Sequence, residues 1–576
     1  MASSLKITNE AFRLKLNFGT ETPADLQRLT SARRDRAAFQ LILQSDLQYS
    51  VNTGTSDWFS AKGRLAGPHE RLRVAVEAPF PSKMNLEEFV TDDDGVEKAD
   101  ILLEQNVRES RANIPSAVWV ELEIPEDTAP GDYPVTVHLY SSKYFEDETP
   151  VQSRTVTLTV ADTVLPAPLD WKFYLDLWQH SSNIARKHDV ALWSEEHFSV
   201  LKQYAASLAA LGQKSITVVA SEIPWNGQSC QEDHEYKGNL FEYSMIRITR
   251  QADGRFTYDY SPMQRYIDLC TDAGICGDIE VFGIVNVWSD AKLTAKCPCP
   301  DYPEAIRLRY LDEADGCRKY MRDAAAIRDY VRALEDYFIR TGQISRVRIA
   351  ADEPADLEKY RQSLTLLQEL APNFRCKTAI NHAEFIEEFH DRIDDFVPYL
   401  RCTVVEYERL MRYRREYPEK KFLWYVCCGG ASPNTFLRTP PIECRMIGIL
   451  TSALRMDGFL RWNYTVWPDD PRHELRYSAF EAGDTNFVYP ANNGGVLLSL
   501  RYKNLQRGIS DYELLEQLRA LRGDSAVDAV LKNVLLASGV HDFWREKALL
   551  PSDKLFSLNW EDYDKTKAEI LRSLQA

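Results

Sequence analysis

Residues 346–354 read RVRIAADEP, and this stretch decides the fold prediction. The run VRIAA is almost wholly apolar, which is typical of a strand buried on both faces in a parallel sheet. Pro354 has no backbone N–H and stops further strand pairing, so Asp352 and Glu353 fall at the carboxyl end of the strand. In sheets of this kind the carboxyl edge is where functional groups gather.

Seven further apolar runs surround this one, and longer helical stretches alternate with them, which predicts βα units and a parallel sheet. The runs are WKFYLD (171–176), SITVVA (215–220), IEVFGIV (279–285), CKTAI (376–380), DFVPYL (395–400), FLWYVC (422–427) and GFLRWNY (458–464). The expected helices are 195–211, 263–273, 324–340, 355–370, 441–455 and 501–521. Eight strands close a (β/α)8 TIM barrel, which we expect over residues 165–525.

The residues before the barrel follow a different pattern. Between about residues 12 and 160, short runs alternate apolar and polar residues, as in AAFQLILQ, RLRVAVEA, AVWVELEI and RTVTLTV, with turn-rich segments between them. This is typical of an antiparallel β-sandwich, which we expect over residues 1–164, with LPAP (165–168) as a stiff linker. Residues 526–576 predict a helical extension packed on the barrel, so the chain is expected to be multidomain.

Acidic residues outnumber basic ones, because 86 Asp and Glu against 69 Lys and Arg give a formal charge of −17 over 576 residues. A field of that sign repels phosphate backbones, so no nucleic-acid partner is expected. No apolar run approaches the ~18–20 residues of a membrane helix, and the N-terminus lacks the apolar stretch of a secretory signal. The 11 cysteines are absent from the first 229 residues, unlike those of a disulfide-stapled secreted domain. We therefore predict a cytoplasmic protein with no membrane partner, and a possible homodimer.

Cysteine and histidine patterns predict neither a metal nor a cofactor. Cys297-Pro298-Cys299 and Cys427-Cys428 lack the CxxC spacing of zinc sites, and no HExxH motif occurs. We therefore expect chemistry carried by side chains and substrate alone.

Aromatic and polar side chains gather directly after the predicted strands. Flat rings flanked by Asn, His and carboxylates suit a sugar, because its apolar C–H face stacks on a ring while its hydroxyls need paired donors and acceptors. The alternative is that such rings only cap the barrel core. We take the following as candidate substrate-binding residues: Trp178, His180, Trp225, Asn286, Asn381, Trp424, Tyr425, Trp462 and Tyr464.

The pair Asp352–Glu353 is the candidate catalytic centre. Acidic doublets are common in this chain, Glu195-Glu196 among them, so a doublet alone carries little weight. This pair differs from the other acidic doublets because it lies at the carboxyl end of a strand that is predicted to be buried. Consecutive strand residues point to opposite faces, and both carboxylates reach one ligand only where the strand stops and twists.

Four segments of the chain resemble glycoside hydrolase family 123: ADEP (351–354), LDLWQH (175–180), GDTNFVYP (483–490) and LSLRYKNLQRGISDYELLEQL (498–518). The resemblance covers nearly the whole chain and implies a β-sandwich ahead of a barrel. That family contains β-N-acetylgalactosaminidases, in which an adjacent Asp–Glu pair runs a retaining, substrate-assisted reaction. Carried over, Glu353 is the acid and base, and Asp352 orients the substrate's 2-acetamido group. Tyr425, Asn381 and Tyr464 are then candidates for polarising the acetamido oxygen.

The predicted function is thus a retaining exo-β-N-acetylgalactosaminidase that needs no enzyme nucleophile. Three alternatives stay open: another β-N-acetylhexosaminidase specificity, a catalytically inactive carbohydrate-binding protein, and a barrel glycosidase with a carboxylate nucleophile. The last requires a second carboxylate ~5–5.5 Å from Glu353. Glu222 is the candidate for it.

Overall fold

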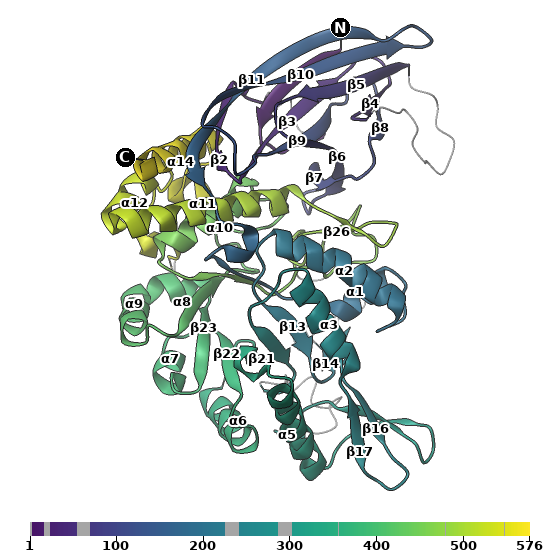
Figure 1. The fold of residues 1–576 in the computed structure, drawn as a ribbon, viewed down its shortest axis with the longest axis vertical. Helices are drawn as coiled ribbons and strands as arrows, with labels where there is room; N and C mark the ends of the chain where they lie inside the picture. The colour runs from purple at the N-terminus through teal and green to yellow at the C-terminus, as the bar shows by residue number, and fades with distance from the viewer. Residues whose placement is uncertain are drawn as a thin grey trace.

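The computed structural model describes residues 3–16, 23–54, 69–224, 241–285, 302–354, 356–477, 480–545 and 548–575. A sheet-rich N-terminal region lies at one end and a second sheet, covered by helices, at the other (Figure 1). Helix α11 (Leu500–Arg522) runs between the two, and α14 (Trp560–Gln575) ends the chain beside it.

Two sheets make up the N-terminal region. One has five antiparallel strands in the order β1 (Ser4–Asn9), β3 (Arg36–Gln44), β9 (Ser116–Glu123), β6 (Ser82–Thr91) and β7 (Glu97–Leu102). The other has six in the order β2 (Arg28–Arg33), β11 (Thr149–Val164), β10 (Gly131–Lys143), β5 (Glu70–Glu77), β4 (Tyr49–Asn52) and β8 (Val107–Ser110). Its pairs β2–β11 and β4–β5 are parallel, so a wholly antiparallel sandwich is not confirmed. Parallel neighbours are joined by long crossovers, which alternation within single strands does not reveal.

The second region is built on one sheet of eight parallel strands, and all eight coincide with predicted runs. Their order is β12 (Tyr174–Leu177), β25 (Gly458–Arg461), β24 (Lys421–Tyr425), β23 (Ile393–Pro398), β22 (Arg375–Ile380), β21 (Val347–Ala351), β18 (Ile279–Phe282) and β13 (Ile216–Val219). Predicted helices are found as α2 (Glu195–Ala210), α3 (Ser261–Asp272), α5 (Ala324–Arg340), α6 (Leu357–Leu370), α10 (Ile442–Ala453) and α11.

The sheet is curled, because side chains from distant strands meet in its interior. Lys377 of β22 lies 2.5 Å from Glu280 of β18 and also contacts Asp176 of β12. Burial, together with the charge of Asp176, raises the pKa of Glu280 to about 8. Lys377 therefore supplies the positive charge that compensates the buried carboxyl groups of Asp176 and Glu280.

The edge strands β12 and β13 meet through side chains more than through backbone. Between them the described residues form one isolated bridge, Leu175 to Gln213. Beyond it, the N–H of Gln179 donates to Thr217 Oγ1 (3.0 Å), and the N–H of Thr217 donates to Gln179 Oε1 (2.8 Å). A continuous ladder here, and with it a full TIM barrel, is not confirmed.

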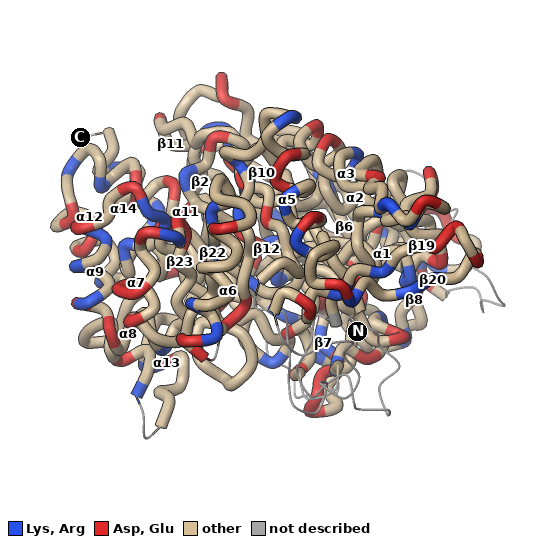
Figure 2. Tube along the Cα trace, turned by 90° about the horizontal axis from the view of Figure 1, so that it is seen from below, with Lys and Arg blue, Asp and Glu red and all other residues tan. Residues whose placement is uncertain are grey.

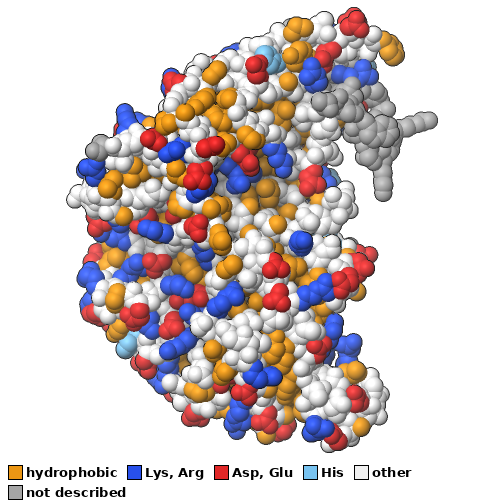
Figure 3. Space-filling model, viewed as in Figure 1, with side chains coloured by type: hydrophobic (Ala, Val, Ile, Leu, Met, Phe, Trp, Pro, Cys, Tyr) orange, Lys and Arg blue, Asp and Glu red, His pale blue; other side chains and the backbone are white. Residues whose placement is uncertain are grey.

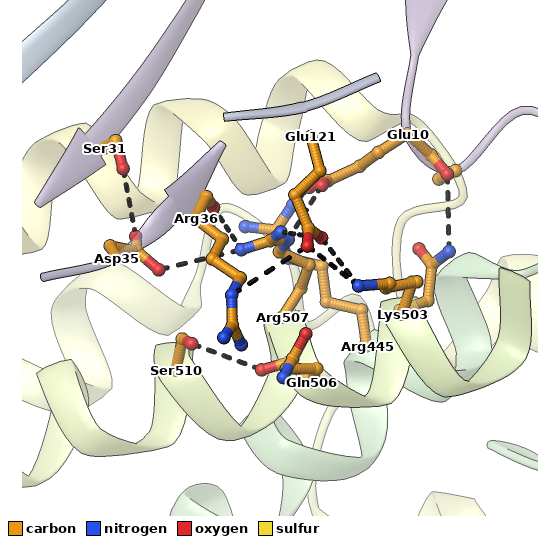
Figure 4. A network of polar contacts seen from close by, with 12 residues as sticks. Glu10, Ser31, Asp35, Arg36, Glu121, Arg445, Lys503, Gln506, Arg507 and Ser510 are labelled. Carbon is orange, nitrogen blue, oxygen red and sulfur yellow. Dashed lines mark hydrogen bonds and ion pairs between the residues drawn. The ribbon is translucent and has the colours of Figure 1, made fainter. Parts of the chain in front are cut away.

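Buried ion pairs tie α11 to the N-terminal region (Figure 4). Glu121 of β9 lies 2.8 Å from Lys503 Nζ and 3.2 Å from Arg507 Nη2. Although Glu121 is buried, these two cations lower its pKa to about 2. Helix α14 adds Lys567, whose Nζ lies 2.6 Å from Asp35. Breaking such a pair leaves a buried charge without compensation, so the two regions are held together firmly.

Charged side chains are spread widely over the molecule. Basic and acidic residues are both scattered along the trace in Figure 2, and they are interspersed on the face shown in Figure 3. None of the described helices is long and apolar enough to cross a membrane. The cytoplasmic location and the homodimer stay predictions.

Candidate active site

Asp352 and Glu353 directly follow β21 at its carboxyl end. Glu353 has a φ of 41°, in the left-handed region that residues other than glycine rarely adopt. This turn ends the strand geometry in which neighbouring side chains diverge, and both carboxyl groups line one pocket. Backbone strain of this kind gathers at functional sites, where the surrounding structure maintains it.

Residues at the ends of two other strands of the sheet hold the carboxyl group of Glu353. Asn381, after β22, donates from Nδ2 to Glu353 Oε2 (3.0 Å). The hydroxyl of Tyr425, at the end of β24, donates to Glu353 Oε1 and lies 3.3 Å from Asn381 Oδ1. With one donor on each oxygen, the carboxyl group is fixed in orientation.

Asp352 has a different environment from its neighbour. Burial, with the charge of Glu353 as the second cause, raises the pKa of Asp352 to about 8. At neutral pH the protonated form of this carboxyl group is therefore favoured. Two adjacent carboxyl groups in unlike surroundings can take different roles in one reaction.

Aromatic side chains form much of the pocket wall. The pocket is lined by Trp178, Asp352, Glu353, Ala379, Tyr425, Cys427, Cys428, Leu460, Trp462 and Phe480. The rings of Trp462 and Phe480 lie 4.9 Å apart at 44°. Aromatic rings of this kind stack on the apolar face of a sugar, and the carboxyl groups can form hydrogen bonds with its polar atoms.

Trp544, from the C-terminal part of the chain, packs near the edge of this site. The ring of Tyr399, after β23, lies 5.2 Å from that of Tyr425 and 5.5 Å from that of Trp544. Residues well past the last strand therefore pack close to the side chains that hold Glu353.

The structure brings together part of the predicted set. Trp178, Tyr425 and Trp462 line the pocket with the acidic pair, and Asn381 contacts Glu353. Trp225 and Asn286 lie outside the described residues.

Three predicted residues are not brought to the pocket. Trp424 is fully buried and donates from Nε1 to Thr451 of α10 (2.8 Å), because it neighbours the inward-pointing Tyr425 on β24 and so points outward. Tyr464 is fully buried, with its hydroxyl 2.8 Å from Ser207 Oγ on α2. His180 is also buried, and burial lowers its pKa to about 3.

Glu222, the alternative nucleophile, is engaged elsewhere. Its Oε1 lies 2.6 Å from Arg309 Nε, and its Oε2 accepts a hydrogen bond from the hydroxyl of Tyr320 (2.5 Å). It is absent from the set of described residues that line the pocket.

Sequence reasoning missed several of the lining residues. Cys427 ends the predicted seventh strand and Cys428 follows it, and that position was the available signal for them. Phe480 lies in the long segment between β25 and α11, where no strand-end rule applies.

Other places in the described part of the chain fit the chemistry less well. A larger cleft of about 830 Å3 lies between α2 and residues 469–472 and 490–494, and the acidic pair does not line it. The described His, Cys, Asp and Glu side chains form no group of three or more that could hold a metal ion. Cys297 and Cys299 lie outside the described residues.

Comparison with known families gives one match to a family description. The description "Glycoside hydrolase 123, catalytic domain" matches residues 178–518, a range that includes every residue lining the pocket. No curated protein matches the chain.

Comparison with solved structures gives a match in fold over the full chain. A family 123 glycoside hydrolase from Clostridium perfringens, reported in a study of glycolipid glycan hydrolysis, has 17% sequence identity and a TM-score of 0.75. The match covers 100% of this chain and 98% of that chain. A putative glycoside hydrolase from Bacteroides vulgatus has 9% identity and a TM-score of 0.31, over 86% of this chain and 79% of the other.

Proposed function

The chain belongs to glycoside hydrolase family 123, and on that premise we propose that it is a retaining exo-β-N-acetylgalactosaminidase that uses substrate-assisted catalysis. The observation that carries the proposal is the pair Asp352–Glu353 in one aromatic-walled pocket. Another β-N-acetylhexosaminidase specificity is the alternative within the same chemistry.

Glu353 is the general acid and base of the proposed reaction. It protonates the glycosidic oxygen as the bond to the anomeric carbon breaks, and later removes a proton from the water that attacks that carbon. The hydrogen bonds from Asn381 and Tyr425 support this role, because they hold the carboxyl group of Glu353 in place for both proton transfers, to the glycosidic oxygen and from the water.

Asp352 acts on the acetamido group of the sugar. Its carboxylate accepts the acetamido N–H, and the acetamido oxygen attacks the anomeric carbon to form a positively charged oxazolinium ring. The raised pKa of Asp352 disfavours its charged form. The developing positive charge offsets that cost, so the ionised carboxylate stabilises the transition state more than the bound substrate.

A carboxylate nucleophile is the mechanism that competes with this one. It requires a second carboxyl group ~5–5.5 Å from the acid, placed to attack the anomeric carbon. Glu222, the candidate for that role, is bonded to Arg309 and Tyr320 instead. Its engagement supports the proposal that the nucleophile comes from the substrate.

The test compares wild type with Asp352→Asn and Glu222→Gln, using a thiazoline of N-acetylgalactosamine as a mimic of the oxazolinium. The proposal predicts that the thiazoline inhibits wild type and Glu222→Gln and binds Asp352→Asn at least tenfold more weakly, since only a carboxylate forms a charge-assisted bond to its protonated nitrogen. A 2-fluoro sugar trapped covalently on the protein, detected by mass spectrometry, would instead establish an enzyme nucleophile.

Sugar specificity needs a separate panel. Aryl β-glycosides of N-acetylgalactosamine and N-acetylglucosamine distinguish the proposed specificity from its alternative by the ratio of their kcat/KM values. Because the Clostridium perfringens structure concerns glycolipid glycans, a glycolipid with a terminal N-acetylhexosamine belongs in the same panel.

A further inference from the structure

Two adjacent thiols lie in the wall of the catalytic pocket. Cys427 and Cys428 follow Tyr425 at the end of β24, and both line the pocket together with Asp352 and Glu353. Both are free cysteines, and their sulfur atoms are 3.8 Å apart. The proposed hydrolysis uses neither of them.

The two thiols have opposite tendencies to ionise. Cys427 is half-buried and Cys428 is exposed. Either thiol can donate the hydrogen bond between the two sulfur atoms, and donation from Cys427 lowers the pKa of Cys428 and raises that of Cys427. Because Cys428 is the exposed thiol and the thiolate is the reactive form, we take Cys428 as the nucleophile of the pair, with Cys427 at 3.8 Å to resolve its oxidised product.

We propose that Cys427 and Cys428 are a peroxide-sensitive modification site. Peroxide converts the two thiols to a reversible disulfide, and the disulfide inhibits catalysis in the pocket. This inference goes beyond the proposed function, because the covalent change is independent of which sugar is hydrolysed.

The chemistry is balanced with hydrogen peroxide as the oxidant. The Cys428 thiolate attacks one peroxide oxygen, the O–O bond breaks, and the departing hydroxide takes a proton to leave as water. The Cys427 thiol then attacks the sulfenic sulfur of Cys428, and the S–O bond breaks as a second water leaves. In total, two thiols lose two electrons and two protons, and one peroxide becomes two waters.

The geometry makes the product easy to reduce. Adjacent Cα atoms are about 3.8 Å apart, whereas unstrained disulfides join Cα atoms about 4.4–6.8 Å apart. A strained disulfide has a more oxidising potential and returns readily to two thiols. The structure therefore favours a reversible switch over a permanent cross-link.

Closing the disulfide disturbs the groups that hold Glu353. The sulfur atoms must approach from 3.8 Å to about 2 Å, which moves the backbone of Cys427 and Cys428. That backbone is fixed by Asn434, whose Nδ2 donates to the Cys427 carbonyl (3.0 Å). Only Val426 separates it from Tyr425, the donor to Glu353. A shift here misplaces the general acid and narrows the pocket.

The first readout is the covalent state of the protein, measured without substrate. The full chain is treated with hydrogen peroxide, free thiols are blocked with iodoacetamide, and unreduced peptides are analysed by mass spectrometry. We expect the peptide that contains both cysteines to escape alkylation and to be lighter by about 2 Da, the mass of the two hydrogens lost. Dithiothreitol should reverse the change.

The second readout is activity on an aryl N-acetylhexosaminide, with each variant compared with its own untreated sample. Wild type should lose at least tenfold in kcat/KM and regain it with dithiothreitol. Cys428→Ser should resist peroxide. Cys317→Ser, which removes an exposed cysteine outside the pocket, should respond like wild type.

Three results would overturn the proposal. They are alkylation of both thiols after peroxide treatment, irreversible sulfinic acid in place of the disulfide, and a disulfide that leaves kcat/KM unchanged. A protein inactive on every N-acetylhexosaminide would count against the proposed function, while the mass readout would still decide the thiol chemistry.

Discussion

Replacing Asp352 with asparagine is expected to stabilise the folded protein, increasingly so as the pH rises. Burial and the charge of Glu353 raise the pKa of Asp352 from 3.8 to about 8, so the folded protein keeps this proton where the unfolded chain has lost it. Wild-type stability therefore falls as the pH rises from about 4 to about 8. The asparagine variant has no such proton to keep.

The magnitude follows from the size of the shift. The pKa of Asp352 is about 8 in the folded protein and 3.8 ordinarily, a difference of about four units. At ~1.4 kcal/mol for each unit, this corresponds to a change of about 6 kcal/mol in the free energy of unfolding. About three of these pKa units lie between pH 5 and pH 8. The free energy of unfolding of wild type can therefore fall by at most about 4 kcal/mol over that pH range because of this group. Asp352 is half-buried and solvent screens part of the effect, so we expect ~2 kcal/mol.

Urea unfolding at pH 5 and at pH 8, followed by tryptophan fluorescence, measures this difference. The stability gained by Asp352→Asn should be ~2 kcal/mol larger at pH 8. Glu353→Gln is the matched control, because it removes only the smaller cause of the raised pKa of Asp352. Its stability should depend on pH less steeply than that of wild type and more steeply than that of Asp352→Asn. An equal gain at both pH values, or a gain that shrinks at pH 8, would refute the reasoning.

Four further predictions concern activity and stability. Glu353→Gln should lower turnover by several orders of magnitude on alkyl glycosides and far less on activated aryl glycosides, since a good leaving group needs no acid; equal losses would contradict the acid role. Tyr425→Phe should lower kcat by about 10–100-fold, the value of one hydrogen bond to a charged group. Tyr464→Phe, which breaks the buried contact with Ser207, should lower the unfolding temperature and leave kcat/KM near wild type. Chelators should leave activity intact, and loss of activity that zinc or calcium restores would show a metal requirement.

Strand positions could be predicted because the strands are buried on both faces. VRIAA at residues 347–351 and FLWYVC at 422–427 read as short apolar runs bounded by polar residues, and a strand lies at each. Closure of the sheet could not be predicted, because the contact between β12 and β13 depends on Gln179 and Gln213, two side chains with no pattern of their own.

The catalytic pair was predictable and much of its surroundings was not. A buried strand that ends in Asp352, Glu353 and a proline is a local signal, and the pocket forms there. Trp424 and Tyr425 were chosen together because both end the same strand, yet alternation sends one toward α10 and the other into the pocket. Phe480 reaches the pocket from a long connection, and its place is decided by tertiary packing alone.

The central claim, that the substrate's acetamido group is the nucleophile, is tested most directly by weakening that nucleophile. Aryl N-acetylhexosaminides carrying zero to three fluorine atoms on the acetyl methyl group differ mainly in the basicity of the acetamido oxygen. Substrate assistance by way of Asp352 and Glu353 predicts that kcat falls steeply with each fluorine, by several orders of magnitude over the series. The logarithm of kcat should then fall in proportion to the basicity of the acetamido oxygen. A kcat that stays within a fewfold over the series would contradict the account.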